Sequence, residues 1–120
     1  MTHRVQATQK LGAFAKGERP LALRHTFQRA DGSVIDMTLF SLPQVKIVDR
    51  DGVSTGLGTG DVVWVTQNTG VAVYQWADAD LAVEGVFFLQ MWAGDNVSQR
   101  YASDVFEYYV EERTVAPNNI

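Results

Sequence analysis

The acidic residues Asp78, Asp80 and Glu84 lie in one short segment and are the residues most suggestive of a bound ion. Carboxylate oxygens are the ligands that Ca²⁺ takes in proteins. The segment is shorter than an EF-hand loop, however, and it has no central glycine for the sharp turn of that motif. Capping of a short helix and solvation explain these acids with fewer assumptions. We therefore predict no metal site.

The glycine-rich stretch Gly56–Asp61 is the second candidate, because such loops can hold a phosphate group. It lacks the GK[ST] ending of a phosphate-binding loop, and no helix is expected after it whose N-terminus could bind an anion. We predict a flexible connection between two strands.

Groups for acid–base or nucleophilic catalysis are scarce. The chain has no cysteine, and its two histidines, His3 and His25, are far apart. His25 lies on the apolar side of its expected strand, where a core histidine with a hydrogen-bonded nitrogen is the ordinary outcome. No Ser/His/Asp arrangement and no carboxylate pair in an evident cleft can be assembled. We predict a non-enzymatic protein with no catalytic residues and no cofactor.

The aromatic residues Trp64, Tyr74 and Trp76 leave two interpretations open. If Val63, Val65, Val71 and Val73 face the core, the rings project from the opposite face and could stack on a sugar or anchor a protein. If the phase is reversed, the rings themselves form the core.

The stretch Val86–Trp92 carries large apolar side chains on both of its alternating faces. A strand of this kind must be covered on both sides. One cover is the opposite sheet; the other is residues 5–15, a long loop or another subunit. We expect Phe87, Leu89 and Met91 to face that second cover, and Phe87→Asp to distinguish a partner from an internal cover.

Turn residues recur between β-branched and aromatic segments, a pattern typical of a sandwich or barrel. The expected turns lie at Asp31-Gly32, Asp51-Gly52, 56–60, 68–70 and 94–96, and the expected strands at 21–28, 34–38, 44–48, 61–66, 71–76, 84–92 and 97–110. In the last strand, Phe106, Tyr108 and Val110 should face inward. With one helical turn near 78–83, the pattern predicts an antiparallel two-sheet β-sandwich of about seven strands.

Charge divides the chain unevenly. Residues 1–20 hold Arg4, Lys10, Lys16 and Arg19 against Glu18, and the whole chain has a net charge of −4. We expect a basic N-terminal arm over 1–20, a sandwich domain over 21–112 and a tail over 113–120. The arm could dock on a neighbour, including another copy of the chain, or its charges could simply aid solubility. The acidic remainder argues against nucleic-acid binding. No signal peptide and no apolar membrane span is evident, so a soluble protein is expected.

The ordered segments LRHTFQRADGSVIDMT, QVKIVDRDGV and NTGVAVYQWADADLAVEGVFF…FEYYV resemble the N-terminal domain of phage baseplate upper proteins and related immunoglobulin-like tail domains. The likeness covers roughly residues 21–112. Its motifs are a "dG" hairpin with the return Val34-Ile35-Asp36-Met37, a "G-x-v-x-y-x-w" strand at 70–76, and a "G-x-[FY]" strand at 85–87 leading to a terminal "F-x-V". These motifs are structural, since they consist of turn glycines and core aromatics.

The resemblance implies an immunoglobulin-like fold and a virion structural protein that binds other particle proteins. Because the family's domain heads a longer polypeptide, we expect here a tail or baseplate accessory or a capsid decoration protein. Its partners would be copies of itself and a capsid, tail or baseplate protein, with assembly in the host cytoplasm. A carbohydrate-binding module that recognises a cell-surface glycan is the alternative. The expected interface residues are Arg4, Lys10, Lys16, Arg19, Trp64, Tyr74, Trp76, Phe87, Leu89 and Met91.

Overall fold

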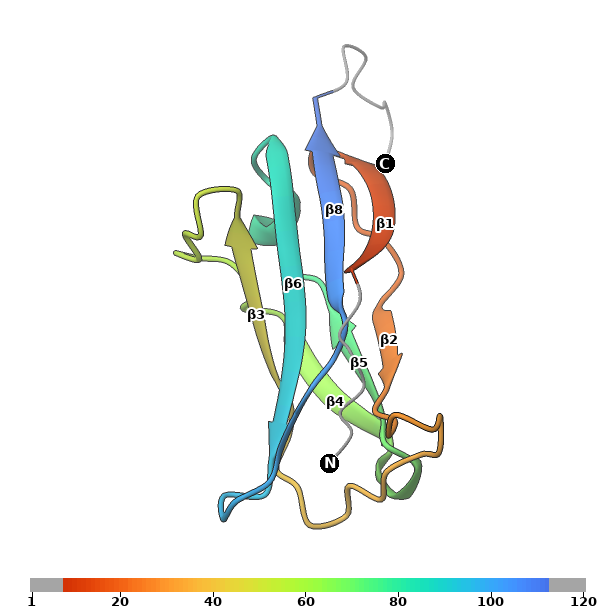
Figure 1. The fold of residues 1–120 in the computed structure, drawn as a ribbon. Coiled ribbons are helices and arrows are strands. Elements are labelled where there is room, and N and C mark those ends of the chain that lie inside the picture. The colour runs from red at the N-terminus through yellow and green to blue at the C-terminus, as the bar shows by residue number, and fades with distance from the viewer. Residues whose placement is uncertain (1–7, 113–120) are drawn as a thin grey trace.

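The computed structural model describes residues 8–112, which form two β-sheets packed face to face (Figure 1). The larger sheet has the strand order β1-β8-β6-β3, with β7 also paired to β6, and the smaller sheet has the order β2-β5-β4. The strands are β1 (Thr8–Ala15), β2 (Leu23–Thr26), β3 (Gln44–Asp49), β4 (Asp61–Thr66), β5 (Val71–Gln75), β6 (Gly85–Gly94), β7 (Arg100–Ala102) and β8 (Val105–Glu111). Two 3₁₀ turns, η1 (Gln67–Thr69) and η2 (Asp78–Leu81), flank β5. The predicted all-β two-sheet sandwich is confirmed.

Strand β1 lies inside residues 1–20, which were expected to form a basic arm. It runs parallel to β8, from Thr8 opposite Val105 to Ala15 opposite Glu111, so the larger sheet is mixed and not purely antiparallel. The register shifts between Lys10 and Gly12. This bulge lets both Leu11 and Phe14 pack against the core although they are three positions apart. Strict alternation is therefore lost, which is why a strand was not predicted there.

Residues 34–38, predicted as a strand, form only an isolated bridge between Val34 and Gln28. Side chains supply hydrogen bonds to the backbone of this segment in place of those that a neighbouring strand would supply. The Gln67 Nε2 donates to the carbonyl oxygens of Met37 and Phe40, at 2.8 and 2.9 Å. The Asp36 carboxylate accepts from the backbone N–H of Thr38 at 3.0 Å. Because the distant Gln67 and the nearby Asp36 satisfy these backbone groups, the segment does not require a partner strand.

The predicted return strand over 97–110 is divided into β7 and β8 by Ser103 and Asp104. The Ser103 Oγ accepts from the Met91 N–H at 2.9 Å and donates to the Asp104 carbonyl at 2.7 Å. A hydroxyl thus replaces one step of the β6 ladder. After this break the predicted phase holds, since Phe106, Tyr108 and Val110 are buried.

The hydrophobic core fills the space between the two sheets. Its buried members come from every layer of the sandwich: Phe27, Ile35, Met37, Phe40, Ile47, Ala72, Tyr74, Leu81, Phe87, Leu89, Met91, Ala93, Phe106, Tyr108 and Val110. The predicted helical turn is confirmed as η2, shorter than expected, with Leu81 turned into this core.

Candidate interaction surfaces

The predicted outward cluster of Trp64, Tyr74 and Trp76 belongs to the core. Tyr74 has no exposed surface, and Trp64 and Trp76 pack against the buried cluster. Both indole N–H groups donate to backbone carbonyls, Trp64 to Ser41 at 3.3 Å and Trp76 to Leu21 at 3.1 Å. The second of the two interpretations of these rings is therefore the one that the structure supports.

Four valines were predicted to face the core together, but their exposure to solvent differs. Val63 and Val65 are 44% and 47% exposed on the outer side of β4, whereas Val71 is buried. A register shift between Trp64 and Thr66 accounts for part of this difference, because it places Val65 at a bulge.

Phe87, Leu89 and Met91 were predicted to face a second cover, but they face the opposite sheet. All three are buried, and the Phe87 ring stacks on Tyr108 with centroids 5.2 Å apart. A side chain enclosed between two sheets has no surface to offer a partner. The interface role expected for these three residues, and for Tyr74, is thus corrected to a core role.

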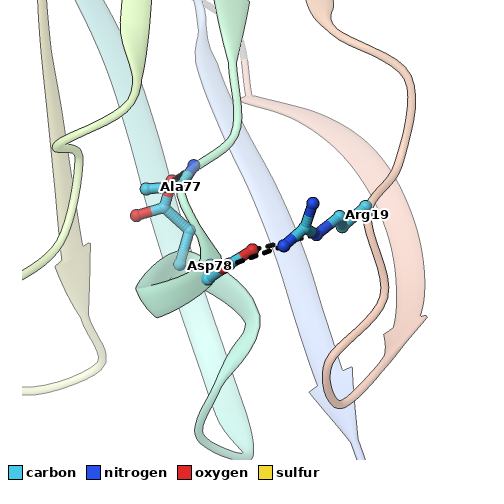
Figure 2. A network of polar contacts seen from close by, with 4 residues as sticks. Arg19, Ala77 and Asp78 are labelled. Carbon is cyan, nitrogen blue, oxygen red and sulfur yellow. Dashed lines mark hydrogen bonds and ion pairs between the residues drawn. The ribbon is translucent and has the colours of Figure 1, made fainter.

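The cationic residues of the predicted arm do not form one cluster among the described residues. Arg4 lies outside the described residues. Lys10 is on β1 opposite Glu107, and Lys16 follows the end of β1, both exposed. The Arg19 guanidinium reaches the Asp78 carboxylate at the start of η2, 3.1 Å away (Figure 2). Exposed pairs of this kind contribute little stability, so the contact positions the 16–22 connection without locking it.

Asp80, one of the three acids considered for a metal site, caps η2 as predicted, but it is buried and not solvated. Its oxygens accept from the Tyr74 hydroxyl at 2.5 Å, the Gly58 N–H at 2.8 Å and the Ala77 N–H at 2.9 Å. The Tyr108 hydroxyl donates to the Asp80 backbone carbonyl at 2.9 Å. Three donors satisfy the charge away from water. Besides capping η2, Asp80 thus joins both sheets at one end of the sandwich, a role that the sequence did not predict.

Burial also raises the pKa of the two tyrosines that contact Asp80, Tyr74 and Tyr108. It raises the pKa of Tyr74 far above the ordinary value of 10.0, with a further rise from the hydrogen bond to Asp80. Burial likewise raises the pKa of Tyr108, with a further rise from the nearby Asp80 charge. Both hydroxyls are therefore protonated donors at neutral pH.

The glycine-rich stretch 56–60 connects β3 and β4, as predicted, and it packs closely against other segments at Gly58 and Gly60. The Gly60 N–H donates to the Tyr74 hydroxyl at 3.0 Å, and a Cβ at Gly60 would lie 1.8 Å from the Gln75 carbonyl oxygen. At Gly58 a Cβ would lie 3.2 Å from the Val45 carbonyl oxygen. Glycine is needed here because two backbones approach each other closely.

His25 is buried, as predicted, on the core side of β2. Its ring meets Phe27 edge-on at 4.7 Å and Phe106 at 5.9 Å. No group of three or more His, Asp or Glu side chains among the described residues is arranged to hold a metal ion.

The outer face of the larger sheet carries an apolar stripe made of Val48, Val86, Phe88 and Tyr109. Val48 lies opposite Phe88 and Val86 lies opposite Tyr109 in the strand register, and all four are half-buried. Glu107 also lies opposite Phe88 and accepts from the Tyr109 hydroxyl at 2.9 Å. Among residues 8–112, no strand or 3₁₀ turn packs over this face (Figure 1).

A groove of about 700 Å³ lies at the end of the sandwich where β6 turns into β7. One wall is the segment 41–44 and the other is the hairpin 92–100. Trp92 lines it and is 43% exposed, as the outward neighbour of the buried Met91 and Ala93. Sequence reasoning placed Trp92 beneath a cover; its position beside the turn residues Gly94-Asp95-Asn96 was the signal that it lies at the open end.

Comparison of the chain with protein-family models and with curated proteins finds no match. Within residues 8–112, no helix is long and apolar enough to cross a membrane.

Proposed function

We propose that this protein is a non-enzymatic component of a bacteriophage particle that binds other particle proteins as a tail or baseplate accessory or a capsid decoration protein. The observation that carries the proposal is the apolar stripe on the outer face of the larger sheet. Its four side chains are half-buried, so each keeps part of its apolar surface in solvent. Contiguous apolar surface on a small domain is typical of protein interaction sites, and aromatic residues are typical anchors of such sites. Phe88 is the central aromatic residue of the stripe.

The strand pairing supports the immunoglobulin-like kinship on which the proposal draws. A constant-type immunoglobulin sandwich pairs its strands B, E and D in one sheet and C, F and G in the other. In this protein the order β2-β5-β4 corresponds to B-E-D, and the order β3-β6-β8 corresponds to C-F-G. The first strand differs, because β1 joins the sheet of β8.

The partners proposed are a capsid, tail or baseplate protein and further copies of this chain, in the virion. The alternative of a carbohydrate-binding module loses its expected platform, since Trp64, Tyr74 and Trp76 are core residues. A sugar would need a different aromatic face.

Incorporation into particles tests the proposal. Wild-type chain and the variants Phe88→Asp and Leu21→Asp are each supplied during particle assembly, and gradient-purified particles are probed for them. Leu21 is the matched control, because it is an apolar residue that is 94% exposed and lies outside the stripe. We expect wild type and Leu21→Asp in the particle fractions and folded Phe88→Asp in the free fractions. Incorporation of Phe88→Asp at the wild-type level would show that the stripe is not the interface. Absence of the wild-type chain from particles would overturn the proposed function itself.

A further inference from the structure

The groove between segment 41–44 and the hairpin 92–100 has the chemistry of a ligand site. We propose that it binds a saccharide, with a sugar ring stacked on the Trp92 indole and with Arg100 favouring an acidic sugar. This inference does not rest on the particle role proposed above, because the groove and the stripe share no residue, although Trp92 and Phe88 lie on the same outward side of β6.

Trp92 differs from the other two tryptophans in a way that favours a ligand. Trp64 and Trp76 pack against the core and use their N–H groups on backbone carbonyls. Trp92 is 43% exposed, and its N–H has no hydrogen-bond partner among the described residues. An indole with an open face and an unused donor matches the apolar C–H face and the hydroxyl rim of a sugar ring.

The polar side chains of the groove are also uncommitted. Within residues 8–112, no hydrogen bond engages the side chains of Gln44, Asn96, Ser98, Gln99 and Arg100. Amide and hydroxyl groups both donate and accept, which is what a hydroxyl-rich ligand requires. The volume of about 700 Å³ lies within the range of small-molecule sites.

The walls of the groove are held in place before any ligand arrives. The Asp95 carboxylate accepts from the N–H groups of Val97, Ser98 and Gln99 at 2.9, 3.0 and 3.0 Å. These backbone bonds lower the pKa of Asp95, so the turn stays locked at neutral pH. The Ser41 N–H and hydroxyl both meet the Gly94 carbonyl at 3.3 Å and join the two walls. A preformed site loses less conformational entropy on binding.

Charge sets the expected selectivity. Asp95 is the groove's one carboxylate among the described residues, and its Oδ1 is occupied by the turn, whereas the Arg100 guanidinium is uncommitted. A guanidinium binds a carboxylate through two parallel hydrogen bonds. Uronic-acid sugars should therefore bind more tightly than their neutral counterparts.

Calorimetric titration of the full chain with matched neutral and uronic-acid oligosaccharides tests the site. We expect binding at millimolar or lower concentration with a preference for the acidic sugars. Trp92→Ala should weaken both classes at least about tenfold, while Trp92→Phe, which retains an aromatic face, should keep most of the affinity. Arg100→Gln should remove the preference and spare the neutral sugars. Leu21→Ala, a change of an exposed apolar residue outside the groove, is the control and should bind as wild type.

Thermal unfolding of each variant verifies that the fold is intact, which is expected because Trp92 and Arg100 lie at the surface. Two results would overturn the inference: no oligosaccharide of either class binds wild type at millimolar concentration, or binding persists undiminished in folded Trp92→Ala.

Discussion

Asp80 illustrates what a single residue does in this fold. Its carboxylate holds Tyr74, Gly58 and Ala77, and its carbonyl holds Tyr108. We expect Tyr74→Phe to lower the free energy of unfolding by about 2 kcal/mol, because a buried charge loses a charge-assisted hydrogen bond. Urea denaturation measures this. Tyr109→Phe, which removes a half-buried hydroxyl bonded to Glu107, is the control and should cost less than about 1 kcal/mol. Equal losses of unfolding free energy in the two variants would show that the hydrogen bond to Asp80 stabilises the fold no more than an ordinary surface hydrogen bond.

Alkaline stability follows from the same two tyrosines. Burial raises the pKa of Tyr74 and Tyr108 above 10.0 in the folded chain, whereas both ionise near their ordinary value once unfolded. The unfolded chain therefore releases protons that the folded chain keeps, and the free energy of unfolding falls as pH rises above about 10. Urea denaturation between neutral pH and pH 11 should show this fall, and it should be shallower in Tyr74→Phe. Stability that stays flat through this range would contradict the assignment.

The glycine-rich connection is the element in which backbone packing dominates. Gly60→Ala places a Cβ against the Gln75 carbonyl, and we expect a loss of about 3 kcal/mol or more. Gly56→Ala is the matched control: no atom lies within 4 Å of its added Cβ, although φ is +75°. That change should cost about 1 kcal/mol through backbone conformation alone. Chemical denaturation compares the two, and equal losses would contradict the close-approach argument.

A charged side chain should unfold the domain on the inner face of β6 and be tolerated on its outer face. Phe87→Asp buries a carboxylate against Tyr108 and should unfold the domain, whereas Phe88→Asp changes a half-buried outer residue and should leave it folded. Circular dichroism melts of the two variants give the answer. A folded Phe87→Asp, or an unfolded Phe88→Asp, would reverse the assignment of the faces.

How far the sequence predicts these elements depends on what specifies each one. Alternation and turn chemistry predicted β3, β4 and β5 and the inward side of β8, because the side-chain period and the glycine turns are local properties of the sequence. They could not predict β1, whose bulge breaks the period, or the loss of a strand at 34–38, where the Gln67 side chain satisfies distant carbonyls. Both depend on contacts between residues far apart in the chain.

At the scale of the whole molecule, the candidate surfaces were harder to predict than the fold. Phe87 and Phe88 are adjacent and equally apolar, so only the opposite sheet decides which of them is core. The same ambiguity led to Trp64, Tyr74 and Trp76 being considered as surface residues. Trp92, by contrast, is a surface tryptophan because it lies on the outward side of β6, between Met91 and Ala93, which face the core. The outer stripe and the end groove thus emerge only once the sheets are assembled.

The composition of purified particles tests the central claim most directly. Quantitative mass spectrometry of gradient-purified phage particles should detect this chain at a fixed molar ratio to the major structural proteins, retained after high-salt washing because the proposed contact is apolar. Its absence from particles, or its loss in the first wash, would contradict the account.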